Sequence, residues 1–283
     1  MLLQKQISPR LHRQTGVTLI ELMVGITIGL LTIAVAMGSL VVSRGVSGTV
    51  SDASQVQQQA SYVFRVIGQQ LRQAASMRLN LAVQKPAGSP IEASDVVAFT
   101  PDLSIIPIAG KDSPGASEYA LSVGYQNYAE PSFTAMSDIS LFRDCLGSKP
   151  SDTMVFNQFV LKDNELRCAG ADNVPQSILR NVAEFQIRYL VQTGATLGQP
   201  TIQYVDATGV GADWSRVFGI EVCLVLYGDE RISLPDGSTY NGCDTTALPT
   251  DISNTSALPA NRKSRLHLTF RNVYQLRSQG LAG

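Results

Sequence analysis

The chain has 283 residues, of which 44% are hydrophobic and 16% charged, and its formal net charge is −1. This composition can build a sizeable core, and it excludes both a disordered, highly charged chain and a strongly basic nucleic-acid-binding protein. The charge is unevenly distributed, because the first sixteen residues carry Lys5, Arg10 and Arg13 and no acid. Loss of these three cations would change the formal charge from −1 to −4.

An uncharged apolar segment follows this basic leader. From Leu22 to Ser43 no residue is charged, which is long enough for one helix across a bilayer of roughly 30 Å. The positive-inside rule keeps the leader in the cytoplasm and sends the remainder outward. Two cleavage routes compete: a secretory signal peptide that ends at the small-x-small site Ala34-Val35-Ala36, or a cut between Gly16 and Val17 that leaves the apolar helix as the mature N-terminus.

Glu21 favours the second route. A carboxylate at the start of an apolar segment costs about 2–3 kcal/mol of insertion, so such residues usually have a function. The stretch Gly16-Val17-Thr18-Leu19-Ile20-Glu21-Leu22 resembles the signal of type IV prepilins, although phenylalanine or methionine is commoner where Val17 stands. The resemblance implies that a prepilin peptidase removes residues 1–16 and that the new amine of Val17 is methylated.

The resemblance also implies a role for Glu21 in assembly. Its carboxylate would pair with the Val17 amine of a neighbouring subunit and set the axial register of the filament. The alternative is a pair within one chain, since the amine and the carboxylate lie one helical turn apart. Gly25 and Gly29 have the GxxxG spacing that allows close helix packing in lipid, although chance glycines would give the same spacing.

Helical periodicity continues beyond the apolar segment and predicts a helix from Val17 to about Leu79. Residues 17–43 form its apolar membrane and filament-core part, and residues 44–83 are assigned to an amphipathic part that packs on a head domain. The apolar residues recur at steps of three and four: Val50, Ala53, Val56, Ala60, Val63, Phe64, Ile67, Leu71 and Ala74.

Residues 84–283 are predicted to form a β-rich head domain, because apolar residues there alternate with a period of two. The segments 153–161 and 165–168 form a predicted hairpin through Lys162-Asp163-Asn164. Long loops are expected around residues 80–92, 107–117 and 228–263. The other predicted strands are 95–100, 118–128, 185–191, 218–226 and 266–270.

Four cysteines agree with export to an oxidising compartment. They allow three pairings, of which Cys145–Cys168 and Cys223–Cys243 join sequence neighbours. The rival use is metal ligation, which is disfavoured because no CxxC motif occurs and only one histidine remains after leader removal. Neither a metal nor a cofactor is expected.

Several short segments resemble the PilW family of large minor pilins. They are Cys145-Leu146-Gly147, the stretch from Asn164 to Cys168, the strand from Leu268 to Asn272, and Trp214 shortly before the strand at 217–226. The acids of a calcium-like loop found in some relatives are missing at 192–198. The resemblance implies an α+β fold with a long N-terminal pilin helix packed on a β-sheet-rich globular head.

The resemblance further implies a non-enzymatic minor pilin that primes or caps type IV pilus assembly near the tip, and hence acts in adhesion and twitching motility. Its partners would be the major pilin, other minor pilins, the prepilin peptidase, the inner-membrane assembly platform and a large tip adhesin. The chain would span the inner membrane once, with its head in the periplasm, before it enters the filament at the cell surface. The alternatives are a GspJ-type pseudopilin of a type II secretion system, or a tip subunit that binds a ligand or DNA.

The sequence lacks recognisable catalytic motifs. His267 is predicted to be a solvated residue on the polar face of a strand, and His12 leaves with the leader. Asp206 and Asp213 flank a glycine-containing segment that is predicted to be a turn. The basic run Arg262-Lys263-Arg265 is predicted to be a solvated edge, so binding of nucleic acid is not expected.

Overall fold

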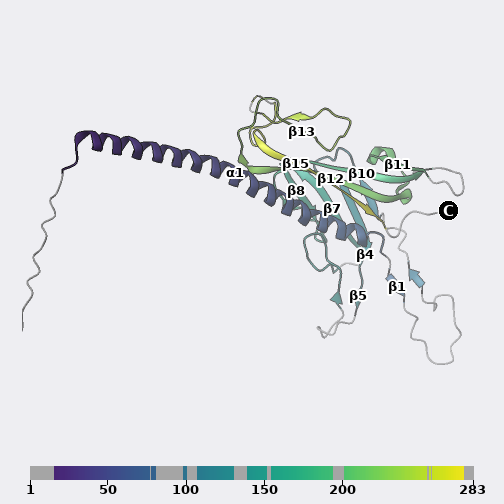
Figure 1. Ribbon diagram of the computed structural model, residues 1–283. Helices are drawn as coiled ribbons and strands as arrows, with labels where there is room; N and C mark the ends of the chain where they lie inside the picture. Colours follow the sequence, from purple (N-terminus) through teal and green to yellow (C-terminus); the bar gives the residue numbers. More distant parts are fainter. Residues whose placement is uncertain are drawn as a thin grey trace, which may run out of the picture. The chain divides into compact units, whose positions relative to one another are not determined.

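The computed structural model describes residues 16–76, 78–80, 98–100, 107–130, 139–151, 154–193, 201–253, 255 and 257–276 (Figure 1). The chain forms two compact units, residues 1–48 and 49–283. One helix, α1 (Leu19–Gln73), begins in the first unit and ends in the second.

In the first unit, α1 is apolar and almost entirely exposed. Three of its hydroxyl side chains are satisfied within the helix, because Thr27, Thr32 and Ser39 donate to backbone carbonyls three or four residues earlier at 2.8–3.0 Å. Among the described residues this is the one helix that is long and apolar enough to cross a membrane, with a mean hydropathy of 2.3 in its most apolar window. The exposed apolar side chains agree with a lipid or protein environment around this part of α1.

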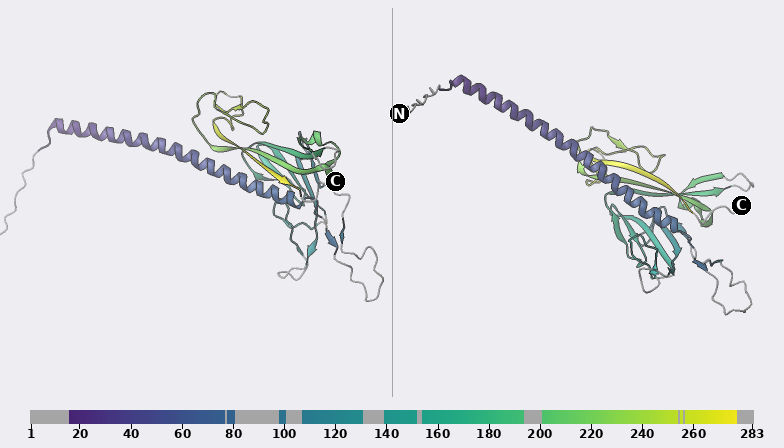
Figure 2. Two further views of the ribbon diagram at one scale, coloured as in Figure 1. Left: turned by 45° about the vertical axis from the view of Figure 1, so that its right-hand side comes forward. Right: turned by 60° about the horizontal axis from the view of Figure 1, so that its bottom comes forward.

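In the second unit, the remaining part of α1 packs with both large sheets of the head (Figure 2). The side chains of Val56, Ala60, Val63, Ile67 and Leu71 are buried, and their steps of three and four residues place them on one helical face. They form a single core with residues of both sheets. The predicted amphipathic helix packed on a β-rich head is therefore confirmed.

The helix ends earlier than the sequence predicts. It stops at Gln73, and Ala75 adopts a left-handed conformation with φ of 56°. The backbone then joins the head, because Ala75 N–H donates to the carbonyl of Gly124 at 3.0 Å and Gln126 N–H donates to the carbonyl of Ser76 at 3.1 Å. The extension of the helix to 79 was wrong, because this tertiary pairing replaces the next helical turn and strand β1 (Arg78–Asn80) follows. Residues 81–83, which were assigned to the same helical part, lie outside the described residues.

The head contains a five-stranded antiparallel sheet in the order β3-β4-β7-β8-β9. The predicted hairpin is confirmed as β7–β8, and its turn residues Asp163 and Asn164 have φ of 55° and 59°. Positive φ at both central positions is typical of the two-residue turn that matches the twist of paired strands. The strands are β3 (Ile108–Gly110), β4 (Leu121–Gln126), β7 (Met154–Lys162), β8 (Glu165–Ala169) and β9 (Gln176–Leu179).

A second antiparallel sheet has four strands in the order β11-β10-β12-β15. Its strands are β10 (Val182–Thr193), β11 (Thr201–Val205), β12 (Val217–Arg231) and β15 (Arg265–Gln275), and two short helical segments precede β12, α2 (Ala207–Val210) and η2 (Trp214–Arg216). Three two-stranded pairs complete the head: β1 (Arg78–Asn80) with β2 (Ala98–Thr100), β5 (Ala129–Glu130) with β6 (Ile139–Ser140), and β13 (Thr239–Tyr240) with β14 (Thr250–Asp251).

Strands β3, β13 and β14 lie in segments that were predicted as loops. They have two or three residues each, which is too short to display a period. Most of the loop predicted at 80–92 lies outside the described residues.

Strand β12 is buried on both faces. One face contributes to the main core, while Cys223, Val225 and Tyr227 on the other face join a second cluster with Tyr240 and Cys243. The segment 232–264, which connects β12 to β15 and which we call the strap, supplies the cover for this outer face. A strand buried on both faces needs a second layer, and here the strap provides it.

The strap buries His267, so the prediction of a solvated histidine was wrong. The residue is only 6% exposed, and its ring stacks on Tyr240 with centroids 4.5 Å apart. Its Nδ1 lies 3.0 Å from the carbonyl of Arg265, whereas its Nε2 is buried without a partner. Burial lowers the pKa of His267, helped by the positive charges of Arg262 and Arg265, while its hydrogen bond to the Arg265 carbonyl and the carboxylate of Glu184 oppose the shift.

This environment predicts a loss of head stability in acid. A histidine with a lowered folded-state pKa is neutral in both states above about pH 6.5, and below that pH only the unfolded chain takes up the proton readily. The free energy of unfolding should therefore fall as the pH drops below about 6.5.

The test uses a fragment beginning at Thr49, which retains the buried residues of α1. Urea unfolding of wild type and of His267→Phe, which keeps an aromatic ring but cannot titrate, should diverge between pH 7.5 and pH 5. Parallel pH profiles would contradict the expectation.

Candidate assembly site

The N-terminus of α1 contains a capping box. Thr18 precedes the first helical residue, its hydroxyl accepts from the N–H of Glu21 at 3.3 Å, and its own N–H donates to the Glu21 carboxylate at 3.2 Å. The Thr18 hydroxyl also lies 3.1 Å from the same carboxylate oxygen. This reciprocal T-x-x-E arrangement satisfies backbone groups that the first turn leaves free.

The capping box gives Glu21 a role that the sequence reasoning missed, although the T-x-x-E spacing is readable in the sequence. The carboxylate uses one oxygen, Oε2, for both contacts with Thr18. Its other oxygen has no hydrogen-bond partner among the described residues. Val17 is 73% exposed beside it. The carboxylate can therefore cap its own helix and still accept a hydrogen bond from outside the chain.

Gly16 lies at the start of the described residues, before the helix begins. Gly25 and Gly29 lie on exposed helix, where an added Cβ would meet nothing within 4 Å. No contact within the described chain therefore requires a glycine at either position. Close packing through Gly25 and Gly29 remains a prediction about a second helix.

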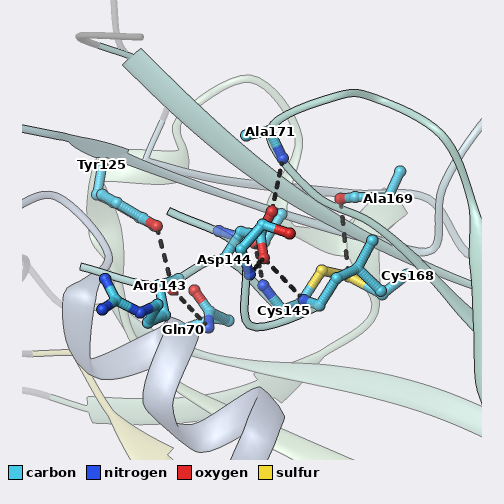
Figure 3. Close-up of a disulfide and its surroundings, with 11 residues drawn as sticks. Gln70, Tyr125, Arg143, Asp144, Cys145, Cys168, Ala169 and Ala171 are labelled. Carbon is cyan, nitrogen blue, oxygen red and sulfur yellow. Dashed lines mark hydrogen bonds between the residues drawn. A yellow bond between two sulfur atoms is a disulfide. The ribbon is translucent and has the colours of Figure 1, made fainter. Parts of the chain in front are cut away.

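The structure joins Cys145 to Cys168, with Cα atoms 6.4 Å apart, beside a buried carboxylate (Figure 3). Asp144 is 3% exposed, and its carboxylate accepts from the N–H groups of Leu146, Ser148 and Ala171 at 2.8–3.1 Å. These three hydrogen bonds offset the cost of burying the charge. They also hold the loop that carries Cys145.

A second polar contact connects this loop to α1. The amide of Gln70 donates to the carbonyl of Arg143 at 3.2 Å, and the hydroxyl of Tyr125 donates to the same carbonyl at 3.3 Å (Figure 3). Burial raises the pKa of Tyr125 to about 12, so its hydroxyl remains a donor at physiological pH. The disulfide loop is thus anchored to both the helix and the five-stranded sheet.

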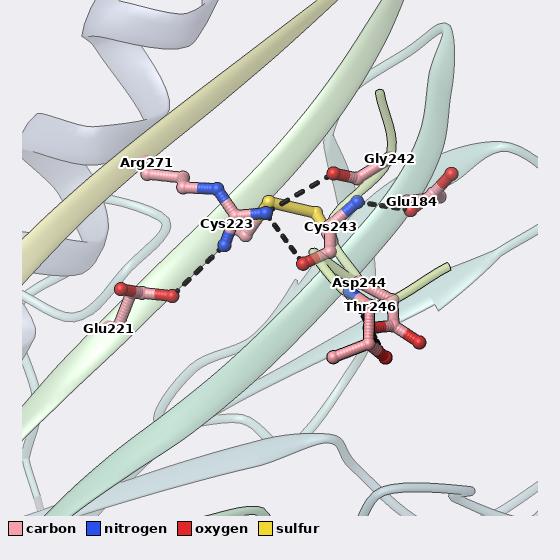
Figure 4. Close-up of polar contacts among 8 residues, drawn as sticks. All are labelled: Glu184, Glu221, Cys223, Gly242, Cys243, Asp244, Thr246 and Arg271. Carbon is pink, nitrogen blue, oxygen red and sulfur yellow. Dashed lines mark hydrogen bonds and ion pairs between the residues drawn. A yellow bond between two sulfur atoms is a disulfide. The ribbon is translucent and has the colours of Figure 1, made fainter. Parts of the chain in front are cut away.

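The other disulfide joins Cys223 on β12 to Cys243 in the strap, with Cα atoms 5.8 Å apart (Figure 4). Charged side chains hold the Cys243 backbone from both sides. The Glu184 carboxylate accepts from Cys243 N–H at 2.7 Å, and Arg271 donates to the Cys243 carbonyl at 2.6 Å while pairing with Glu221 at 3.1 Å. The two pairings are those that sequence proximity favoured.

The basic run near the end of the strap is more enclosed than predicted. Arg262, Lys263 and Arg265 are only partly exposed, so the expectation of a solvated edge was wrong. Arg262 donates to the hydroxyl of Tyr240 at 3.1 Å, and Arg265 donates to the carbonyl of Gly228 at 2.9 Å. Arg262 bonds to another residue of the strap and Arg265 joins β15 to β12, which leaves both guanidinium groups less available to a polyanion.

The acids around the glycine-containing segment have structural partners. Asp206 caps the short helix α2 through the N–H of Gly209 at 2.7 Å, and Asp213 accepts from the hydroxyl of Ser215. Asp112 accepts from the N–H groups of Ala207 and Thr208 at 2.8 and 2.9 Å. Among the described residues no group of three or more histidines, cysteines and acids lies close enough together to hold a metal ion. Trp214 packs edge-on against Tyr189, with ring centroids 5.0 Å apart.

Two family models match the chain. The prokaryotic N-terminal methylation motif matches residues 11–37, and the model of type IV pilus-assembly protein W matches residues 151–278. No curated protein matches the chain. A type IV-like pilin from Thermus thermophilus matches with a TM-score of 0.40 and 14% identity, over 80% of this chain and 99% of that chain.

The methylation motif, the apolar N-terminal helix and the β-rich head together define a type IV pilin-like protein. The match over residues 151–278 covers β7 through β15, which includes the whole four-stranded sheet and the strap. Residues 151–278 of the chain are similar to type IV pilus-assembly protein W, a match that spans 128 of the 283 residues.

Proposed function

We propose that this chain is a minor pilin that primes or caps type IV pilus assembly and is incorporated near the filament tip. The observation that carries the proposal is that the methylation motif continues into a helix whose first part is exposed and apolar and whose last part packs in a PilW-type head. An exposed apolar helix needs either lipid or other helices around it. The membrane before assembly and the filament core after assembly provide these two environments in turn.

The proposal includes the partners and the location of the protein. The prepilin peptidase would remove residues 1–16, and the inner-membrane assembly platform would receive the anchored chain with its head in the periplasm. The major pilin and other minor pilins would then pack around the helix, with a large tip adhesin as a further partner. Adhesion and twitching motility would depend on the chain indirectly, through the number of pili. The family suggests a structural protein without enzymatic activity, which is itself a substrate of the peptidase.

The leader is expected to be removed between Gly16 and Val17, with methylation of the new amine. Intact-mass measurement of the membrane-bound protein, from cells with and without the prepilin peptidase, reads both events. A mature N-terminus at Met37 would instead support a secretory signal peptide. Sheared filaments from the same cells should contain the protein in small amounts relative to the major pilin. Absence of the protein from pili, together with a type II secretion defect in cells that lack it, would support the pseudopilin alternative.

A further inference from the structure

A pocket of about 370 Å³ opens on the outer face of the four-stranded sheet. Gln186 and Arg188 lie two residues apart on β10 and so face the same side of the sheet, where Gln186 is the register partner of Cys223. Tyr204 on β11 forms one side of the pocket, and Asp244 and Thr246 form another. Because Asp244 directly follows Cys243, the disulfide fixes the position of this second side (Figure 4).

The pocket has polar groups that the fold leaves unused. The Oε1 atom of Gln186 is fully buried and has no hydrogen-bond partner. The guanidinium of Arg188 lies over the ring of Tyr204, 5.8 Å from its centroid, and makes no hydrogen bond to another described residue. A buried polar atom without a partner costs free energy, so a turn of the Gln186 amide that brought Oε1 to the pocket surface, where a ligand could bond to it, would recover that cost.

The carboxylates of Asp206 and Asp244 are exposed at the rim. Each uses Oδ1 inside its own turn: Asp206 accepts from Gly209 N–H at 2.7 Å, and Asp244 accepts from the N–H and hydroxyl of Thr246 at 2.8 and 2.7 Å. These hydrogen bonds, with a contribution from Arg188, lower the pKa of Asp244, which therefore stays ionised. The turns hold both carboxylates in fixed directions.

These groups limit the chemistry of a ligand. Two carboxylates disfavour an anion, and the guanidinium disfavours a simple cation. Vicinal hydroxyl groups match the pocket, since a hydroxyl can donate to a carboxylate or to Gln186 Oε1 and can also accept from Arg188. The ring of Tyr204, which is 45% exposed as a residue, has Arg188 over one face and can offer its other face to the C–H groups of a sugar ring.

We propose that this pocket binds a neutral saccharide unit, with Gln186, Arg188 and the two rim carboxylates as its hydrogen-bonding groups and Tyr204 as its stacking surface. Its volume is within the range of small-molecule sites, at the lower end. The site goes beyond the proposed assembly role, because none of the residues that line the pocket lies on α1.

The test uses the full chain, purified from membranes in a zwitterionic detergent whose head group contains no sugar. Saturation-transfer NMR is recorded with glucose, galactose, N-acetylglucosamine and lactose, each at about 10 mM, which detects dissociation constants in the millimolar range. We expect transfer to the ring protons of at least one sugar. Tyr204→Ala and Gln186→Leu should each weaken binding about tenfold or more.

Tyr62→Ala is the matched control. Tyr62 on α1 is exposed and has the guanidinium of Arg65 6.0 Å from its ring centroid, so the same kind of aromatic–arginine pair is lost outside the pocket. This variant should bind sugar as the wild type does. Absence of transfer from all four sugars, or equal binding by wild type and Tyr204→Ala, would overturn the proposal. Binding of the zwitterionic dipeptide glycylglycine in place of sugars would also overturn it and would make the pocket a peptide site.

Discussion

Glu21→Gln is expected to be cleaved after Gly16 and inserted into the membrane, yet to be missing from filaments. The carboxamide can still accept from Thr18 N–H, because a capping box tolerates glutamine in place of glutamate. The substitution does remove the negative charge of the side chain. If the Val17 amine of a neighbouring subunit pairs with that charge in an apolar surrounding, an unpaired ammonium costs roughly 3 kcal/mol or more per interface. Counts of pili and blots of sheared filaments, in cells that carry the variant as the sole copy, measure the effect.

Thr18→Val provides the matched control for this experiment. The substitution removes the hydroxyl that accepts from Glu21 N–H and keeps the side-chain shape and the carboxylate, so it weakens the helix start by about 1 kcal/mol. It should remain in filaments. The opposite result, with normal assembly of Glu21→Gln and loss of Thr18→Val, would assign Glu21 to the capping box alone and refute its role in axial register.

Removal of the strap disulfide by Cys223→Ala with Cys243→Ala is expected to lower the free energy of unfolding of the head by about 3 kcal/mol. The bridge joins residues separated by 20 positions, and release of a loop of that length returns this much conformational entropy to the unfolded chain. The strap should nevertheless stay in place, because Glu184 and Arg271 still bond to the backbone of residue 243. Urea unfolding of the fragment that begins at Thr49 measures the change.

The second disulfide is the matched comparison. Its cysteines are separated by 23 positions, so the loop-closure argument predicts nearly the same loss for Cys145→Ala with Cys168→Ala. Losses that differ by more than about 1.5 kcal/mol would mean that native contacts of the bridges, such as those around Asp144, decide their stabilisation. Adding Glu184→Ala to the strap variant removes the partner of Cys243 N–H and Tyr240, and should cost a further 1–3 kcal/mol or so.

Much of the fold could be predicted from the sequence because its signals are local. The uncharged run from Leu22 to Ser43 specifies an apolar helix, and the three- and four-residue steps from Val56 to Leu71 specify a helix and the face that it buries. Alternation in the head predicted the long strands, and Asp163-Asn164 predicted the hairpin turn. The prepilin-like segment around Gly16 and Glu21 was readable for the same reason, since its residues are contiguous.

The tertiary structure decided the features that depend on distant residues. The helix ends at Gln73 because Ala75 pairs with Gly124 on β4. His267 is buried because the strap returns over the outer face of β15, which the alternation of that strand alone does not reveal. Asp52 on α1 is only 5% exposed, since its carboxylate accepts from the N–H groups of Asp229 and Glu230 at 3.2 and 2.9 Å.

The same distinction separates the assembly site from the pocket. The groups around Glu21 are neighbours in one helical turn, so their spacing is determined by the sequence itself. The pocket gathers residues from β10, β11 and the strap, whose positions are set by strand register and by the bridge from Cys223 to Cys243. Local periodicity specifies which face of an element is apolar, whereas only the packing of elements specifies which polar groups are enclosed together.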